Sequence, residues 1–497
     1  MKIAFVQEQM YPYLGNMYMI AVAKSAGYEV EVFISGGNDK FIEEIKAYSP
    51  NIICFQSTTP EYLFTKQTAY ELKKHIPDCF IVVGGWHPTF APEILEKETC
   101  FNALCLGEGE TPFRIFLESY PDLNMVKKVP GFHVRVGNDI SKNPMVHLEE
   151  DLDRLPFPDR SAYYDKYPLL GNQLTKSFIA GRGCAYPCTY CFNDNMKKAY
   201  KGKGKFVRFR SPENICQEIK EVIKNYPQTR YIQFHDDTIN GDLKWLRNFC
   251  DVYKKEIGLP WIANGRIERL DDNLVQKLKQ SGMDKFSFSI EHGNEEFRTK
   301  LLKRMMTNEE IFEGSRLLKK YNIRFQVGNI LGLPGENFDL ALDTLKINQQ
   351  IKAPYAAAFI FQPYPGTQLQ RFAKEEGYID DSFDSESLTG HGSWGSKSNK
   401  VLSVIKLENV NKFVNLRCFF HFLVSHPWAL PIVKPFLNLP PNRFFELFTN
   451  WYDFKMRFKY SANAGEKINY ILQFTQNLFP TPLQNLLKKR FNYQNAN

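Results

Sequence analysis

The sequence of 497 residues predicts an α/β protein with three main parts: an N-terminal doubly wound domain, a central partial or full α/β barrel and a C-terminal helical cap. Three observations predict this order. Strand-length apolar runs alternate with helical stretches over about the first 120 residues, and a second such series begins at residue 176. The last hundred residues lack this alternation, have a helical pattern and contain many aromatic side chains.

In the N-terminal part, five apolar runs have the length of strands, and the stretches between them have helical spacing. The expected strands are Ile3–Gln7, Val30–Ile34, Ile52–Ser57, Ile81–Gly85 and Ala103–Gly107. The expected helices are Met17–Ala26, Phe41–Tyr48, Glu61–His75 and Pro92–Lys97. An open parallel sheet binds ligands at the carboxyl ends of its strands. The polar and glycine-rich residues fall at those ends, in Ser57–Thr59, Gly84–Thr89 and Gly107–Glu110.

The central part repeats the strand–helix unit six times. The expected strands are Ser177–Ala180, Tyr231–His235, Trp261–Asn264, Lys285–Ile290, Arg324–Leu331 and Ala356–Phe361. Helical stretches separate them, among them Ile215–Asn225, Asp272–Ser281, Asn308–Tyr321 and Asn337–Gln350. Six successive units indicate a partial or full barrel, whose active site is expected at the carboxyl ends of the strands.

These patterns set the expected domain boundaries. The first domain covers residues 1–140, a proline-containing connecting segment covers 141–175, and the barrel covers 176–380. Residues 381–400, rich in Ser, Gly and Asp, are expected to form a flexible loop. Residues 401–497 form the basic, aromatic, helical C-terminal domain.

The composition is that of an ordinary folded protein, with 43% hydrophobic and 24% charged residues, and it excludes a disordered, collagen-like or coiled-coil chain. The net charge is +8, and residues 401–497 alone contain 12 Lys/Arg against 4 Asp/Glu, a difference of +8. The rest is close to neutral, which does not favour a nucleic-acid-binding protein. Ten cysteines are too few for a disulfide scaffold. With no signal-peptide pattern and no membrane-spanning run, a cytoplasmic location is expected.

The strongest motif is a group of three cysteines in the stretch Gly183–Cys191. The spacing C-x3-C-x2-C presents Cys184, Cys188 and Cys191 as ligands of a cubic iron–sulfur cluster. Three protein ligands leave one iron open to a substrate or cofactor. A zinc site is the alternative, but zinc usually takes four ligands, and no partner pair lies nearby.

On these motifs the region from about Lys176 to Asp380 resembles the radical S-adenosylmethionine (SAM) superfamily. The resemblance implies a [4Fe-4S] cluster whose open iron binds SAM. Further motifs at strand ends support it: Phe234–Thr238, Asn264–Arg266, Ser289–Gly293, Gly328–Glu336 and Pro363–Thr367. The implied SAM contacts are Tyr190, Asp236, Asp237, Arg266, Ser289, Glu291 and Leu331. Taken singly, the aspartates could be helix caps, and Arg266 and Glu291 could form an ion pair.

A doubly wound domain before such a barrel resembles the cobalamin-binding domain of the class B radical SAM enzymes. The resemblance implies cobalamin contacts at Ser57, Thr58, Gly84, Gly85, His87, Gly107, Glu108 and Gly109. One feature departs from the family pattern. The D-x-H-x-x-G motif, whose histidine ligates cobalt, is absent, because the corresponding stretch Gln7–Gly15 contains no histidine. A nucleotide-binding or vestigial domain is the alternative.

The resemblance implies a cobalamin-dependent radical SAM enzyme, with a methyltransferase as the leading expectation. It would act on an unactivated carbon or phosphorus centre through a 5′-deoxyadenosyl radical and methylcobalamin. Alternatives are an oxidative cyclase or rearrangement enzyme, similar to the anaerobic magnesium-protoporphyrin ester cyclase, and a cobalamin-binding regulatory protein. tRNA methylthiolation would need a further N-terminal cysteine triplet, which the sequence lacks.

The implied partners are a small-molecule substrate and a low-potential electron donor, flavodoxin or ferredoxin. The aromatic C-terminal region favours a hydrophobic substrate. That region is expected to cap the barrel, and closure over a substrate or contact with a membrane surface are its functional alternatives.

Overall fold

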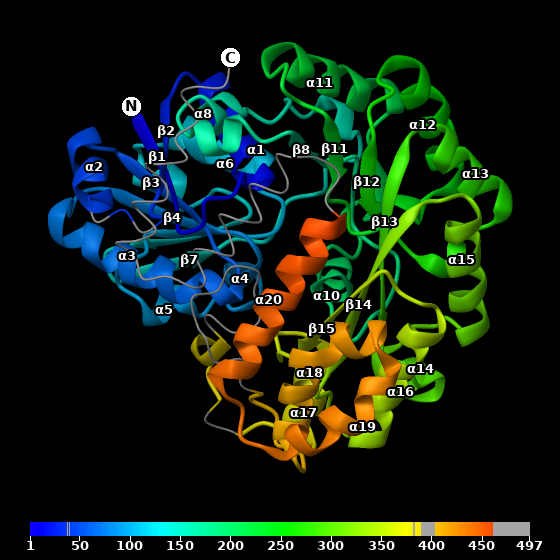
Figure 1. Cartoon of the computed structure of the whole chain (residues 1–497). Coiled ribbons are helices and arrows are strands. Elements are labelled where there is room, and N and C mark those ends of the chain that lie inside the picture. The colour runs from blue at the N-terminus through cyan, green and yellow to red at the C-terminus, as the bar shows by residue number, and fades with distance from the viewer. Residues whose placement is uncertain (37, 39, 381–382, 389–402, 461–497) are drawn as a thin grey trace.

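A computed structural model describes residues 1–36, 38, 40–380, 383–388 and 403–460 (Figure 1). The N-terminal part is built on sheet A, whose strand order is β2-β1-β3-β4-β5-β6-β7. The first five strands are parallel, as predicted, and the antiparallel hairpin β6-β7 extends the sheet. The strands are β1 Lys2–Gln7, β2 Glu29–Ile34, β3 Ile52–Gln56, β4 Phe80–Gly84, β5 Ala103–Cys105, β6 Phe132–Val136 and β7 Asp139–Lys142.

Helices cover both faces of sheet A because alternate strand residues are apolar on both sides. In β1, Ile3 and Phe5 pack towards one face, and Ala4 and Val6 pack towards the other. The first face carries α1 Leu14–Ser25, α6 Glu110–Ser119, α7 Leu123–Val126, α8 Ser161–Tyr164 and α9 Pro168–Gly171. The second carries α2 Phe41–Tyr48, α3 Tyr62–His75 and α5 Ile94–Lys97. The short helix α4 Trp86–Phe90 follows β4 and contacts β4 and β5. The strand order reverses direction between β1 and β3, the place where doubly wound sheets bind ligands.

The central part is a partial barrel of six parallel strands, sheet B, in the order β15-β14-β13-β12-β11-β8. The strands are β8 Thr175–Phe178, β11 Tyr231–Phe234, β12 Trp261–Asn264, β13 Met283–Glu291, β14 Arg324–Leu331 and β15 Tyr355–Ile360. Its outer face packs against α11 Pro212–Asn225, α12 Leu243–Glu256, α13 Asp272–Gln280, α15 Asn308–Lys320 and α16 Phe338–Gln350. The predicted α/β class and the order of its parts are confirmed.

Shorter elements lie at the carboxyl end of the barrel. They are the hairpin β9 Gly181–Arg182 and β10 Arg208–Phe209, the helices α10 Phe192–Ala199, α14 Glu295–Leu302 and α17 Gln368–Glu375, and the short turns η3 Ile239–Gly241 and η4 Ile267–Arg269. A further short turn, η1 Thr59–Glu61, follows β3 at the carboxyl end of sheet A.

The described C-terminal region is a helical cap on the β15 side of the barrel (Figure 1). It contains α18 Val410–Ser425, η6 Pro427–Ala429, α19 Leu430–Val433, η7 Lys434–Asn438 and α20 Arg443–Tyr460. Of the expected loop 381–400, only residues 383–388 are described, with η5 at Ser385–Leu388, and residues 461–497 lie outside the described residues. Within the described ranges, no helix combines the length and apolar character needed to cross a membrane.

Candidate active site between the two sheets

The carboxyl end of sheet A lies against the mouth of the barrel, and largely buried ion pairs join them. Glu108, which follows β5, pairs with Arg182 at 3.0 Å and with Arg208. Glu110, at the start of α6, also pairs with Arg182. The two arginines belong to the β9-β10 hairpin, and Arg182 stands two residues before Cys184. These pairs tie the end of sheet A to the segment that leads into the cysteine loop.

Aromatic side chains extend this contact. The backbone N–H of Glu108 donates to the hydroxyl of buried Tyr200 at 2.8 Å. The same hydroxyl requires a glycine at position 107, because a Cβ there would collide with it. The ring of Trp86, from α4, lies 4.0 Å from that of Phe192, which directly follows Cys191. The carboxyl end of sheet A and the mouth of the barrel, which are both predicted to bind ligands, therefore face each other.

The cysteine loop, residues 183–191, is fixed by later parts of the chain. Gly183 has φ +80°, and a Cβ there would collide with the carbonyl oxygen of Phe206. Thr189 donates its hydroxyl to the carbonyl of Leu301 at 2.7 Å, and its own carbonyl accepts the N–H of Leu369 at 2.9 Å. Because Leu301 and Leu369 belong to α14 and α17, these two helices from later in the chain help to hold the loop in place.

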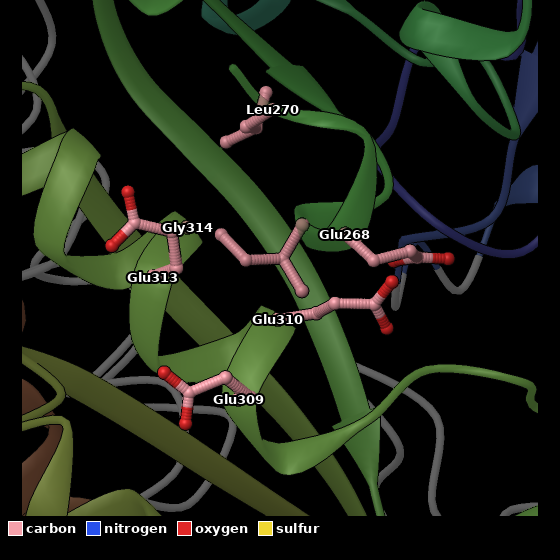
Figure 2. Close-up of a pocket in the computed structure, with 7 residues that line it drawn as sticks. Glu268, Leu270, Glu309, Glu310, Glu313 and Gly314 are labelled. Carbon is pink, nitrogen blue, oxygen red and sulfur yellow. The ribbon is translucent and has the colours of Figure 1, made fainter. Parts of the chain in front are cut away.

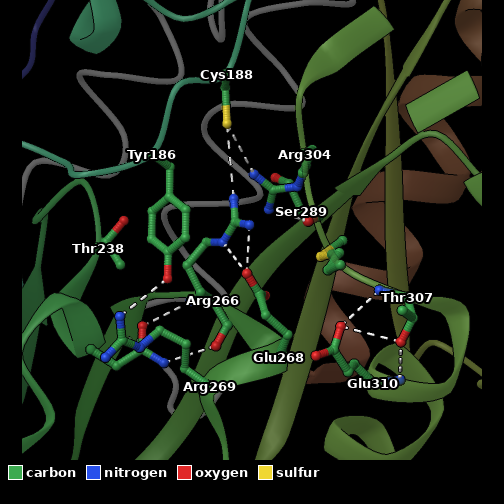
Figure 3. A network of polar contacts seen from close by, with 12 residues as sticks. Tyr186, Cys188, Thr238, Arg266, Glu268, Arg269, Ser289, Arg304, Thr307 and Glu310 are labelled. Carbon is green, nitrogen blue, oxygen red and sulfur yellow. Dashed lines mark hydrogen bonds and ion pairs between the residues drawn. The ribbon is translucent and has the colours of Figure 1, made fainter. Parts of the chain in front are cut away.

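Two buried arginines converge on Cys188 (Figure 3). A guanidinium nitrogen of Arg266 and one of Arg304 each lie 3.9 Å from its Sγ. Arg266 stacks on the ring of Tyr186 at 3.9 Å and pairs with Glu268. The Arg266–Glu291 ion pair that the sequence left open is therefore not formed.

The donor set of this loop suits an iron–sulfur cluster. No three ligand side chains in the described part of the chain stand close enough together to hold a single metal ion. The thiols nevertheless lie within electrostatic reach of one another, and burial raises the pKa of Cys184 and raises that of Cys191 to about 12. Thiolate ligands are stabilised by positive charge, which Arg266 and Arg304 supply. Nε of Arg304 is buried without a hydrogen-bond partner, so it can donate a hydrogen bond to a further anionic group.

Two buried carboxyl groups stand after β11. Asp236 accepts the backbone N–H of Ala180 at 3.2 Å and that of Gly181 at 2.5 Å. Burial raises the pKa of Asp236 to about 7, and burial also raises the pKa of Asp237. The helix-cap alternative does not hold, because Asp242 caps α12. Paired carboxyl groups with raised pKa values suit a positively charged ligand group such as the SAM amino group.

Tyr190, Ser289 and Glu291 come together around Arg304. The Tyr190 hydroxyl donates to Glu291 at 2.8 Å, and Arg304 donates to that hydroxyl at 3.3 Å and to the carbonyl of Ser289. Glu291 has φ +68°, and the register of β13 on β14 shifts between Ser289 and Glu291. Such backbone conformations are rare outside glycine and cluster at functional sites. Arg304 carries no sequence motif that we recognised, and only the fold brings it here.

The glycine-rich segment after β14 is locked to the end of β13. The Leu331 side chain is buried in the core, so its backbone is the part available to a ligand. Gly328 makes room for Ser289, since a Cβ there would lie 2.5 Å from its Oγ. Nε2 of His292 lies 3.3 Å from Oε1 of Glu336, with both side chains fully buried.

Small residues at the ends of β3 and β4 form the opposite surface. Gly85 has φ +98°, and a Cβ there would lie 2.9 Å from the carbonyl oxygen of Ser57, so the glycine allows the two strand ends to pack. A Cβ at Gly84 would meet only Cys105, at an ordinary 3.7 Å, which leaves space beside this strand end. Thr58 forms a capping box with Glu61.

His87 lies on α4, and its buried Nδ1 is 3.2 Å from the hydroxyl of Thr59. Its Nε2 is buried without a hydrogen-bond partner, and burial lowers the pKa of this histidine to about 4. A neutral imidazole with a free nitrogen is suited to a polar group of a ligand. Together with the space at Gly84, this surface fits a bulky cofactor such as a corrinoid.

The remaining residues predicted to contact cobalamin have other contacts in this structure. Gly107 and Glu108 contact Tyr200, Arg182 and Arg208 of the barrel, as described above. A Cβ at Gly109 would lie 3.0 Å from Sδ of Met19. Their contact with cobalamin stays a prediction.

The stretch without the family histidine is ordered by Gln7. Its side-chain amide donates to the carbonyls of Gln9 and Tyr11 at 2.7 and 2.8 Å, and its carbonyl accepts the hydroxyl of Tyr163 at 2.6 Å. Tyr11 is thereby turned towards the barrel, where its hydroxyl lies 3.3 Å from Nε2 of His235. The sequence assigned no role to Tyr11, and it included His235 only as part of the Phe234–Thr238 motif.

The interior of the barrel has a polar wall. Along β13 and β14 most residues that face the helices are buried and apolar, with buried Asn329, which pairs with Asn348 of α16, as the polar exception. The alternate residues are mostly partly accessible. The accessible set on the strands includes Gln233, Asn264, Ser287, Ser289 and Gln326. A wall of this kind can bind a substrate with hydrogen-bonding groups.

A separate shallow pocket lies between η4 and α15 (Figure 2). Its walls are formed by Ile267, Glu268, Leu270, Glu309, Glu310, Glu313 and Gly314. Glu268 links it to Arg266, but its other residues take no part in the site described above.

Comparisons with known proteins agree with these two surfaces. The model of the radical SAM superfamily matches residues 178–347, and that of the B12-binding domain matches residues 3–117. An uncharacterized methyltransferase of Pyrococcus horikoshii is 24% identical over 370 residues, which cover 73% of this chain and 78% of the relative. The anaerobic magnesium-protoporphyrin IX monomethyl ester cyclase of Cereibacter sphaeroides is 22% identical over 93% of this chain and 76% of its own.

Among solved structures, the cobalamin-dependent SAM radical enzyme OxsB with aqua-cobalamin bound shares the fold, with a TM-score of 0.63 and 15% identity over 99% of this chain and 81% of that one. The chain belongs to the cobalamin-binding class of the radical SAM superfamily, and it is a radical SAM enzyme. The cofactors of this class are a [4Fe-4S] cluster, SAM and cobalamin.

Proposed function

We propose that this enzyme transfers a methyl group to an unactivated carbon or phosphorus centre of a small molecule in the barrel interior. One observation carries the proposal: the carboxyl end of the B12-binding sheet lies directly against the cysteine loop, through Glu108 and Arg182. A corrinoid held on one edge and SAM held on the other would then face the same interior space. When bound, the cluster and SAM supply one-electron chemistry that opens an unreactive bond, and the corrinoid supplies the methyl group.

The chain's own residues would hold these groups as follows. Cys184, Cys188 and Cys191 bind the cluster, and Arg266 and Arg304 offset its negative charge. SAM is held by Tyr190, Asp236, Asp237, Ser289, Glu291, Arg304 and the backbone of Leu331. Ser57, Thr58, Gly84, Gly85 and His87 line the corrinoid, with Gly107, Glu108 and Gly109 at its rim.

Within this arrangement the protein positions groups and excludes water. Buried Asp236 and Asp237 would orient the amino group of SAM. The polar barrel wall, including Gln233 and Gln326, would hold the substrate by hydrogen bonds and so fix the reacting centre. We also infer that a low-potential flavodoxin or ferredoxin supplies the electrons.

Cyclisation or rearrangement is the second candidate. The similarity to the anaerobic cyclase extends over 93% of this chain, so it includes part of the C-terminal cap that closes the β15 side of the barrel. Because both reactions use the same cofactors, they differ in the fate of the corrinoid methyl group rather than in the cofactor-binding residues.

The deciding experiment is anaerobic reconstitution with iron, sulfide, cobalamin, SAM and a low-potential reductant, with products measured by mass spectrometry. Methyl transfer predicts both 5′-deoxyadenosine and S-adenosylhomocysteine, with S-adenosylhomocysteine formed only when corrinoid is present. Deoxyadenosine alone, despite bound corrinoid, would favour the cyclase or rearrangement reaction. Absence of corrinoid binding would contradict both.

A further inference from the structure

The C-terminal cap exposes a continuous strip of apolar side chains. Residues 427–438 form one helical run through η6, α19 and η7. Its inner side consists of Ala429, Val433 and Leu437, which pack into the main core. Most of the exposed residues are apolar, with Lys434 and Asn438 as the exceptions, and we call the apolar ones the apolar ridge: Pro427, Trp428, Pro431, Ile432, Pro435 and Phe436.

Buried contacts beneath the apolar ridge hold it in place. The amide of buried Asn415, in α18, donates to the carbonyls of Leu437 and Leu439 at 3.2 and 2.7 Å. With Val433 and Leu437 held in the core, the ridge cannot turn its large side chains inward without losing buried apolar contacts. Its exposure is therefore a fixed feature of the fold.

The exposed side chains are large. Trp428 is 67% exposed and Ile432 is 60% exposed, and Phe444, at the start of α20, is 80% exposed. Single exposed apolar residues are common, but a run of them on one face marks an interaction surface. The outward prolines lack an N–H group, so they bring no extra donor into an apolar environment.

The charge beside the ridge has one sign. No acidic residue occurs between Glu408 and Glu446 in the sequence, and Glu446 pairs with Arg417 at 3.0 Å. Two cations are exposed in this region, Lys434 within the helical run and Arg443 at the start of α20. Apolar side chains including a tryptophan, flanked by cations, are the combination that binds the headgroup region of an anionic bilayer. A second copy of this surface would instead bring like charges together.

We propose that the apolar ridge docks this enzyme on the surface of an anionic lipid bilayer. Trp428, Ile432 and Phe436 enter the headgroup region, and Lys434 and Arg443 contact lipid phosphates. In Figure 1, α19 lies at the lower edge of the molecule, away from the strands of sheet A. Docking there would leave sheet A away from the membrane.

The test is co-sedimentation of the full chain with phosphatidylcholine vesicles that contain or lack phosphatidylglycerol. The full chain should bind the phosphatidylglycerol vesicles, and the double variant W428S/I432S should lower its partition coefficient at least about tenfold. K434E/R443E should remove the preference for anionic vesicles. The matched control L123S/M125S replaces two exposed apolar residues of α7 and should bind as the unaltered chain does. Circular dichroism checks that each variant is folded.

Three results would overturn the proposal. The first is failure of the folded full chain to bind either vesicle. The second is equal binding by W428S/I432S. The third is a concentration-dependent dimer, measured by light scattering without lipid, that disappears in W428S/I432S, because it would assign the ridge to a second copy. None of these results bears on cofactor binding, so the methyl-transfer proposal stands or falls separately.

Discussion

Replacement of Glu108 by alanine tests whether this residue positions the cysteine loop. In the folded chain its carboxylate pairs with Arg208, whose side chain is 1% exposed, and with Arg182 at 3.0 Å. Removing one member of a buried pair costs about 3–5 kcal/mol, because the other charge stays buried. The Glu108 side chain keeps 22% exposure, so water offsets part of the loss, and we expect about 2–3 kcal/mol.

Hydrogen–deuterium exchange of peptides that cover β9 and the cysteine loop measures this cost locally. A loss of about 2–3 kcal/mol corresponds to a roughly 30- to 150-fold faster exchange when opening is a pre-equilibrium. The control is Glu96→Ala, which breaks the exposed Glu96–Lys142 pair and should leave the exchange of these peptides unchanged, because a solvent-exposed ion pair contributes little to stability.

The same variant separates the two roles considered for Glu108. If Glu108 acts only by contacting cobalamin, corrinoid affinity falls while exchange in the cysteine loop stays within about threefold of the unaltered protein. That result would refute the positioning role. Faster exchange at β9, with Glu108→Gln intermediate between the two, would support it.

Four further predictions follow from the site. Cys188→Ala should reduce iron and sulfide in the reconstituted protein to background, whereas Cys216→Ala, a buried helical cysteine, should not; retention of a full cluster would contradict the assignment. Arg304→Met should weaken SAM binding about 10- to 100-fold by calorimetry, because a charged hydrogen-bond donor is lost, and unchanged affinity would exclude this role. Because burial lowers the pKa of His87 and of His235 to about 4, each of these histidines binds fewer protons in the folded than in the unfolded chain between about pH 4 and 6.5, and its contribution lowers the free energy of unfolding as the pH falls through this window. In urea titrations the stability of His235→Gln relative to the unaltered chain should therefore rise as the pH falls from about 6.5 to 4, and a constant difference would argue against this shift. Burial raises the pKa of Asp236 to about 7, so the contribution of this carboxyl group to the free energy of unfolding is full below about pH 4 and is lost as the pH rises through 7. Asp236→Asn should not show this loss. A variant with the same pH profile as the unaltered chain would contradict the pKa shift.

Much of the fold could be predicted because the apolar pattern is strong where strands are buried on both faces. Trp261–Asn264 and Arg324–Leu331 form strands with the predicted bounds. The hairpin β6-β7 could not be predicted in the same way, because its strands are short, and His133 and Arg135 interrupt the apolar pattern. It adds to sheet A by antiparallel pairing with β5, which depends on tertiary structure.

The candidate site shows the same division. The spacing of the three cysteines and the glycines at strand ends could be predicted to form binding sites, because each of these signals lies within one short segment of the sequence. The pairing of Glu108 with Arg182 joins residues 74 positions apart, and Arg304 reaches Cys188 across 116 positions. No pattern within one segment specifies such contacts. Gly107 illustrates the limit, since the sequence suggested a cofactor contact, whereas the structure shows that Tyr200 already requires glycine there.

The central claim is that one chain holds the cluster with an open iron and the corrinoid at the same time. The most direct measurement is electron paramagnetic resonance of the reduced, reconstituted protein with and without SAM, together with iron and corrinoid analysis. The account predicts about four irons and one corrinoid per chain, and a cluster signal that SAM alters in the unaltered protein but that is absent in Cys188→Ala. A cluster signal that SAM leaves unchanged, or a chain that takes up no corrinoid, would contradict it.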